Sequence, residues 1–278
     1  MVYSDSKTNK IAASANAIAY SSDHNKNYIE GAPHVKHSSL LDMYMRLAKD
    51  CYNEALRYSS PPKVLDLGAG DGSATIPFLE MGAEVTAVDI AEDQLKLLQR
   101  KSSPYGNKLH VRCGDALEVM KSMQHTQQHF NIITANSFLH HIPDYLGFIR
   151  FAANILGPHG QFLSFQDPLR YDSLGKLTYA FSTGTYFCWR ILQGDILAGM
   201  KRRLRRNKGF YLEDSIEDNV EYHVVRNGVD QDAIQTLFNG MGFNCRIIRY
   251  FSTQSSGWQR VGSVLGVKNS FGVIAKKV

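Results

Sequence analysis

A regular alternation of apolar runs and helix-like segments over residues 64–166 constrains the fold more than any other feature of this chain. The apolar runs have the length of buried strands, and segments with the helical period separate them. Strands that alternate with helices are typical of a parallel sheet covered by helices on both faces. The expected strands are 64–67, 84–89, 109–113, 130–135 and 161–166.

A polar residue stands at or just after the end of each of these five expected strands. Ligands on parallel sheets bind outside the carboxyl ends of the strands, so polar side chains at those ends are candidates for contact. Five such residues in order are a stronger indication than any one alone. These residues are Asp66, Asp89, Asp115, Asn136 and Asp167.

A glycine-rich turn, residues 68–72, follows the first strand and leads into an expected helix over 73–81. Glycines are needed where the backbone takes a positive φ or approaches a ligand closely. Dinucleotides and S-adenosylmethionine both bind at such turns. The dinucleotide fingerprint has a third glycine where this chain has Ser73, and Asp71 would repel a pyrophosphate at the helix N-terminus. Asp66 suits a ligand with a positive ammonium or sulfonium group.

Five blocks of this sequence resemble the class I S-adenosylmethionine-dependent methyltransferases of the small-molecule type. The blocks are Val64-Leu65-Asp66-Leu67-Gly68-Ala69-Gly70-Asp71-Gly72, Val88-Asp89, Gly114-Asp115, Phe130-Asn131-Ile132-Ile133 and Leu139-His140-His141-Ile142-Pro143-Asp144. The resemblance implies a doubly wound α/β fold. Its sheet would be seven-stranded and mostly parallel with the last strand antiparallel, a Rossmann-like methyltransferase fold, here with an α-helical cap insertion. Asn131 departs from the family, which often has an acid there.

The expected cofactor is S-adenosyl-L-methionine, held by residues from several blocks. Asp89 can accept hydrogen bonds from both ribose hydroxyls, and Asp115 can accept one from the adenine amine. As structural alternatives, Asp66 and Asp115 could serve only in turns, and Asp89 could cap the helix that begins near Ala91. The residues expected to bind the cofactor are Tyr28, in an N-terminal lid, and Asp66, Gly68, Ala69, Gly70, Asp89, Ile90, Gln94, Gly114, Asp115, Ala116, Asn136 and Ser137.

Two adjacent histidines, His140 and His141, follow the fourth strand, where the family places its methyl-transfer site. Transfer to a hydroxyl is helped by a base, and histidine titrates in the useful range. Adjacent side chains point in different directions, so only one is expected to face the site, and the resemblance favours His141. The alternative is that His141 only packs or contacts the cofactor. His34 and His37 are weaker candidates for the base, and no spacing in the sequence indicates a metal site.

The regions outside 64–166 divide the chain further. We expect a tail and lid helix over 1–60, the cofactor-binding core over 61–167, an aromatic and basic cap over 168–229, and the rest of the core over 230–278. The cap is expected to be helical over 173–180 and 186–206, and 252–269 is expected to be a polar loop. The basic run 201–208 is either a solvated helix end or a contact for an anionic acceptor, a lipid-linked acceptor or a membrane surface.

Composition limits the class of protein. The net charge of +5 does not by itself favour nucleic acid, and no run is long enough to span a membrane, so a cytoplasmic location is expected. The sequence therefore predicts an enzyme that methylates a small molecule, on a hydroxyl of a specialised metabolite, sugar or glycolipid. It indicates no oligomeric state. The alternative is a methyltransferase-fold protein that binds the cofactor but catalyses another reaction or acts as a partner protein.

Overall fold

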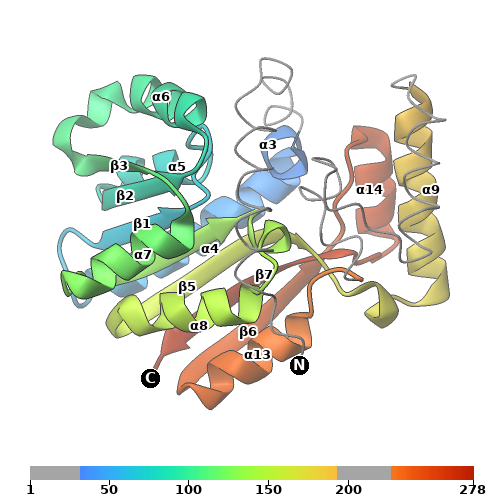
Figure 1. Ribbon diagram of the computed structural model, residues 1–278. Coiled ribbons are helices and arrows are strands. Elements are labelled where there is room, and N and C mark those ends of the chain that lie inside the picture. Colours follow the sequence, from blue (N-terminus) through green and yellow to red (C-terminus); the bar gives the residue numbers. More distant parts are fainter. Residues whose placement is uncertain (1–31, 193–226) are drawn as a thin grey trace.

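The computed structural model describes residues 32–192 and 227–278, which contain one seven-stranded sheet with helices around it (Figure 1). The strand order is β3-β2-β1-β4-β5-β7-β6. β7 is antiparallel to both of its neighbours, and the pairs among β1 to β5 are parallel, which confirms the predicted fold. The strands are β1 (Lys63–Leu67), β2 (Glu84–Asp89), β3 (Leu109–Cys113), β4 (Phe130–Asn136), β5 (Leu156–Pro168), β6 (Phe243–Tyr250) and β7 (Ser270–Lys277).

Helices cover both faces of the sheet. One core cluster joins the sheet to α7 (Ala116–His125), α8 (Tyr145–Ile155) and α13 (Gln231–Gly240). A second cluster joins the opposite face to α4 (Ser38–Leu56) and α5 (Thr75–Met81), while α6 (Glu92–Lys101) packs on β2 and β3 through a smaller one.

Aspartate side chains start three of the helices. Asp115 accepts hydrogen bonds from two backbone N–H groups of α7, Asp144 accepts one from α8, and Asp230 accepts two from α13. Such caps satisfy N–H groups that have no partner within the helix. Asp115 and Asp144 also fix where α7 and α8 begin at the carboxyl end of the sheet.

The structure corrects two expectations outside the alternating region. Residues 252–269 contain α14 (Ser256–Val264) and are not only a polar loop. The helix packs inward through Gln259, whose side chain bonds Thr253 N and Phe251 O, and through Gly262, against which the Phe251 ring lies. Because a polar residue and a glycine make that contact, the segment has no apolar stripe on its inner face. The expected break between two helices at 181–185 is also wrong, since α9 (Lys176–Leu192) runs through it. Residues 193–206 of the second expected helix lie outside the described residues.

A short helix, α3 (Pro33–Lys36), is tied to the segment before α14. His37 Nε2 lies 2.6 Å from Thr253 O, and Lys36 Nζ donates to Gln254 O at 3.1 Å. These contacts hold α3 beside the carboxyl end of the sheet. His37 therefore has a structural partner, while the expected tail and Tyr28 lie outside the described residues.

Candidate functional site

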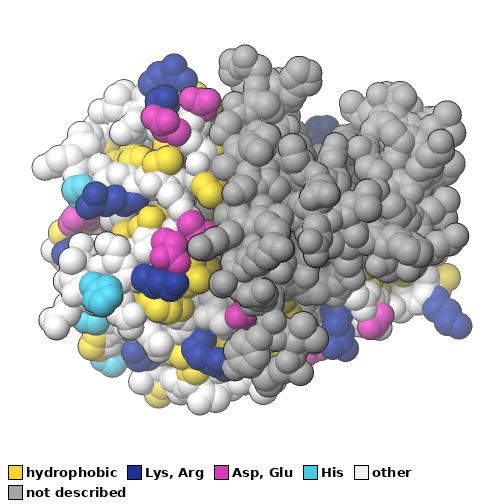
Figure 2. Space-filling view, viewed as in Figure 1, with side chains coloured by type: hydrophobic (Ala, Val, Ile, Leu, Met, Phe, Trp, Pro, Cys, Tyr) yellow, Lys and Arg dark blue, Asp and Glu magenta, His cyan; other side chains and the backbone are white. Residues whose placement is uncertain are grey.

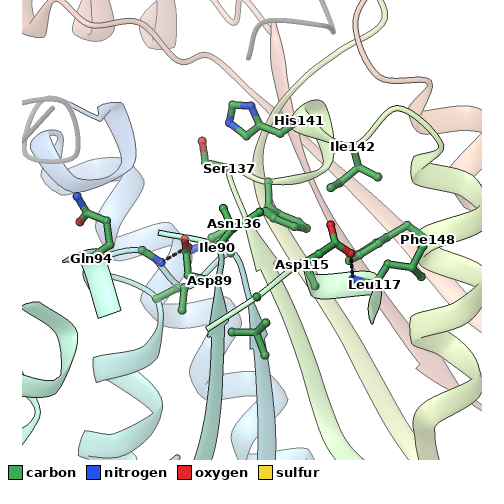
Figure 3. A pocket seen from close by; sticks show the side chains of 18 of the residues that line it. Asp89, Ile90, Gln94, Asp115, Leu117, Asn136, Ser137, His141, Ile142 and Phe148 are labelled. Atoms are coloured by element: carbon green, nitrogen blue, oxygen red, sulfur yellow. Dashed lines mark hydrogen bonds between the residues drawn. The ribbon is translucent and has the colours of Figure 1, made fainter. Parts of the chain in front are cut away.

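A cavity of about 380 Å³ opens at the carboxyl ends of the parallel strands (Figure 3). Its wall comes from the turns after β1, β2, β3 and β4, with α3 contributing from the N-terminal side. The structure brings most of the sequence-predicted site residues together here. Those that line it are Gly68, Ala69, Gly70, Asp89, Ile90, Gln94, Gly114, Asp115, Ala116, Asn136, Ser137 and His141.

The glycine turn is shaped by positive φ angles and close packing. Gly68 and Gly70 have φ values of 74° and 53°, and a Cβ built on Gly68 would lie 2.1 Å from a ring carbon of Phe138. The backbone N–H groups of Gly68 and Ala69 both donate to Val88 O. The turn is therefore pinned to the end of β2, and its glycines let backbone line the cavity.

Asp89 joins the glycine turn to the end of β2. Its Oδ2 accepts from Gly70 N and its Oδ1 from Ala91 N, each at 2.8 Å. Burial raises the pKa of this carboxyl above its ordinary value. A carboxylate has about four acceptor positions, so each oxygen keeps capacity for a second donor. Asp89 therefore faces the cavity and bonds the residue before α6, but it is not the helix cap, because the N-cap of α6 is Ala91 and has no side-chain bond.

Asp66 lies beneath the turn and is not among the residues that line the cavity. It is fully buried, and Thr75 Oγ1 donates to its Oδ2 at 2.5 Å. Burial raises the pKa of Asp66 to about 7. Its contact with a cofactor stays a prediction, while the structure assigns it a hydrogen bond that holds the start of α5.

The charge of Asp71 is offset by Lys101 from the end of α6. The Lys101 ammonium donates to Asp71 Oδ2, and Asp71 lines the cavity while being 7% exposed. This ion pair weakens the argument that Asp71 would repel a pyrophosphate. The two residues lie 30 positions apart in the sequence, so the helical period of α6 offers no signal for the pair.

Asn136 and Ser137 end β4 at the cavity. Ser137 has a φ of 50°, and its backbone N–H donates to Phe165 O at 2.7 Å. Neither polar atom of the buried Asn136 amide has a hydrogen-bond partner within the described ranges. Buried polar groups are nearly always paired, so an unpaired amide in a cavity wall favours a ligand with donors and acceptors.

The two adjacent histidines face different surroundings. His141 lines the cavity, whereas His140 is turned toward the end of β5, with its Nδ1 at 2.9 Å from Asp167 Oδ1. Their rings are in contact, with centroids 3.9 Å apart. Burial lowers the pKa of His140 to about 4. His141 is therefore the histidine of this pair that lines the cavity, and His140 lies behind it.

His34 is a further histidine at the cavity, although the sequence made it only a weak candidate for the base. It reaches the cavity from α3, is 7% exposed, and its Nδ1 has no hydrogen-bond partner among the described residues. Burial lowers the pKa of His34 to about 4. Its place depends on the contacts of α3 with residues 253 and 254, more than 200 positions away, so sequence spacing could not reveal it.

Aromatic residues from α8 and the turn before it form an apolar part of the wall that sequence reasoning also missed. Phe138, Phe148 and Phe151 line the cavity, and the rings of Phe138 and Phe148 lie 5.5 Å apart. The spacing of Phe148 and Phe151 on one helical face was the available signal. An apolar wall with a few convergent polar groups is typical of small-molecule sites.

The aromatic residues of the expected cap are described only in part. Phe181 packs against Phe251 and Trp258 with centroids 5.6 and 5.8 Å away, and no described residue of 168–192 lines the cavity. The basic run 201–208 lies outside the described residues. Over the ranges that are described, no group of three or more His, Cys, Asp or Glu is placed to hold a metal. No helix there is long and apolar enough to cross a membrane.

Comparison with solved structures shows the same fold in methyltransferases. The magnesium protoporphyrin IX methyltransferase of Synechocystis PCC 6803, with bound S-adenosylmethionine, is 13% identical with a TM-score of 0.53, over 96% of this chain and 97% of that one. The 1,6-didemethyltoxoflavin-N1-methyltransferase of Burkholderia thailandensis is 16% identical with a TM-score of 0.56, over 100% and 92%. At these identities the likeness concerns the fold alone.

Among curated proteins, the chain is similar to ubiquinone biosynthesis O-methyltransferases. It is 33% identical to that of Idiomarina loihiensis over 99 residues, and 30% identical to that of Nitrosospira multiformis over 97. The first match covers 36% of this chain and 40% of the relative, so it concerns less than half of either protein. Residues 40–247, more than half of the chain, match the methyltransferase domain family. The chain therefore belongs to the methyltransferase domain family, as a class I methyltransferase whose cofactor is S-adenosylmethionine.

Proposed function

We propose that this enzyme transfers a methyl group to a hydroxyl oxygen of a small-molecule acceptor, with His141 as the base. The observation that carries the proposal is the place of His141 in the wall of the cavity that the glycine turn also lines. The relatives named as O-methyltransferases support oxygen as the acceptor atom. Figure 2 shows positive and negative side chains interspersed on the described part of one face, which suits a small-molecule acceptor better than nucleic acid.

The residues around the cavity fit the cofactor. Asp89 would accept from the ribose hydroxyls with the capacity that its two backbone bonds leave, and the unpaired amide of Asn136 would bond the methionine portion. Asp115 uses Oδ1 to cap α7, so Oδ2 is the oxygen proposed to face the adenine amine, beside Ala116. The bound cofactor supplies an electrophilic sulfonium methyl group.

The proposed task of His141 is to take the acceptor proton. As the acceptor oxygen forms its bond to the methyl carbon, the O–H proton passes to a ring nitrogen of His141, which later releases it to water. The cavity wall would contribute by holding the acceptor oxygen in line with the sulfur–methyl bond, which breaks as the oxygen–carbon bond forms. General-base catalysis of this kind is worth about 10²- to 10⁴-fold in rate.

The first test is the His141→Ala variant, with the exposed His110→Ala on β3 as a control. An acceptor is first identified by a labelled-methyl screen of cell extracts read by mass spectrometry. We expect His141→Ala to lower kcat by about 10²-fold or more, with S-adenosylmethionine affinity from calorimetry within about threefold of the wild type. Unchanged turnover at saturating acceptor would exclude His141 as the base.

The runner-up function is a protein that binds the cofactor without transferring its methyl group. Tight binding of S-adenosylmethionine with no labelled product in the screen would favour it. An anionic or lipid-linked acceptor and contact with a membrane surface stay predictions, because they rest on the run 201–208 outside the described residues. A cytoplasmic location also stays a prediction.

A further inference from the structure

A fully buried carboxyl group lies directly behind the two histidines. Asp167 lies near the end of β5, and its Oδ1 accepts a hydrogen bond from the backbone N of His140 at 3.1 Å and lies 2.9 Å from His140 Nδ1. Only 11% of the His140 side chain is exposed. Both ends of this contact are therefore shielded from water. A hydrogen bond to a charged group is stronger in such a buried place than in water.

The contact fixes the short 3₁₀ turn Leu139–His141 that carries His141 to the cavity. The backbone bond ties the turn to β5, and the side-chain bond fixes the plane of the His140 ring. That ring lies 3.9 Å from the His141 ring at an interplanar angle of 44°. The His141 ring thus rests on a surface whose orientation Asp167 sets.

We propose that Asp167 and His140 are positioning residues that act through His141: the carboxylate holds the turn and the His140 ring, and that ring holds the His141 imidazole toward the cavity. Neither group is proposed to touch the acceptor. For His140 this role differs from the one that the sequence suggested, which was that of a second candidate base. The inference rests on the proposed function, because it gives His141 a task to be positioned for.

The protonation states follow from the burial of the pair. Burial lowers the pKa of His140 to about 4 and raises that of Asp167 to about 7. Above about pH 7 the carboxylate can only accept, so the proton of neutral His140 must lie on Nδ1. Asp167 also interacts electrostatically with His141 and with Tyr250 on β6, and His140 does so with His34. An ionised Asp167 therefore favours the protonated form of His141.

The test observes the histidine rings by NMR in the full-length protein, so it needs no acceptor. Histidine is labelled with ¹³C and ¹⁵N, and the His140 and His141 signals are assigned with His140→Gln and His141→Gln. At about pH 8.5 we expect His140 to carry its proton on Nδ1. The titration midpoint of His141 should fall by about one pH unit or more in Asp167→Asn, which keeps an acceptor but removes the charge.

Two further variants separate positioning from general damage to the fold. Asp167→Ala removes both bonds and should leave His140 in mixed tautomers, while Asp167→Asn should retain the Nδ1 proton. Ser164→Ala, at a buried hydroxyl on the same strand, should leave both signals unchanged. A proton on Nε2 of His140 in the wild type, or an unmoved His141 midpoint in Asp167→Asn, would overturn the proposal. These outcomes do not depend on turnover, so they are distinct from failure of His141 as the base.

Discussion

Replacement of Asp66 by asparagine tests whether this carboxyl group has the buried environment that the structure gives it. Asp66 is fully buried beneath the glycine turn and bonds Thr75 Oγ1. Asparagine keeps an oxygen that can accept this bond but carries no charge and no titratable proton. The comparison therefore isolates the free energy of ionising the group.

The magnitude follows from the pKa. Burial raises the pKa of Asp66 from 3.8 to about 7, so between these values the folded protein binds a proton that the unfolded chain has released. The group thus contributes stability at low pH that is lost as the pH rises through about 7. One pKa unit is worth about 1.4 kcal/mol, which gives a loss of about 2 kcal/mol between about pH 5.5 and about pH 8.5.

The assay is urea unfolding of the ligand-free protein at both pH values. We expect the free energy of unfolding of the wild type to fall by about 2 kcal/mol more than that of Asp66→Asn over this interval. The variant keeps the similar pH-dependent contribution that Asp167 makes to the free energy of unfolding, because the pKa of Asp167 is also raised to about 7. Asp42→Asn, at an exposed site on α4, should follow the wild type. Equal pH dependence in the wild type and Asp66→Asn would refute the reasoning.

Two further substitutions probe the cofactor site by calorimetry with S-adenosylmethionine. Gly68→Ala should weaken binding by about tenfold or more, because the new Cβ would meet the Phe138 ring. The control is Gly106→Ala, which should bind the cofactor normally, because Gly106 also has a positive φ but its Cβ would point into open space. Asp89→Ala should weaken binding by about 100-fold through the loss of two charge-assisted hydrogen bonds, whereas the exposed Asp93→Ala should not. A change below about threefold would exclude ribose binding by Asp89.

The sequence was sufficient to predict the sheet and most of the residues that line the cavity. β2 and β3 have the predicted bounds, 84–89 and 109–113. The lining came from short contiguous blocks over 64–144, where a strand and the turn after it fix the geometry together. Residues that reach the cavity through distant contacts were predicted poorly, as His34 shows, since its position is set by hydrogen bonds from α3 to 253 and 254.

The four aspartates near the strand ends show which property of a site could not be predicted from the sequence, namely the direction in which each carboxyl group points. In the sequence, Asp66, Asp89, Asp115 and Asp167 share one feature, an acid at or just after the end of an expected strand. In the structure, Asp89 and Asp115 line the cavity, while Asp66 and Asp167 are fully buried and bond Thr75 and His140. Which way each carboxyl turns depends on the pleat of its strand and on partners from other elements.

The carboxyl groups in the cavity wall and the buried carboxyl groups therefore have different roles. The two carboxyls in the cavity wall can contact what binds there as well as bonding backbone N–H groups, whereas the two buried carboxyls act only through the elements they hold. Asp66 holds the start of α5 beneath the glycine turn, and Asp167 holds the turn that presents His141. Substitution of a buried carboxyl should therefore alter stability, pH dependence and histidine tautomers before it alters cofactor affinity. Substitution of Asp89 should alter cofactor affinity first.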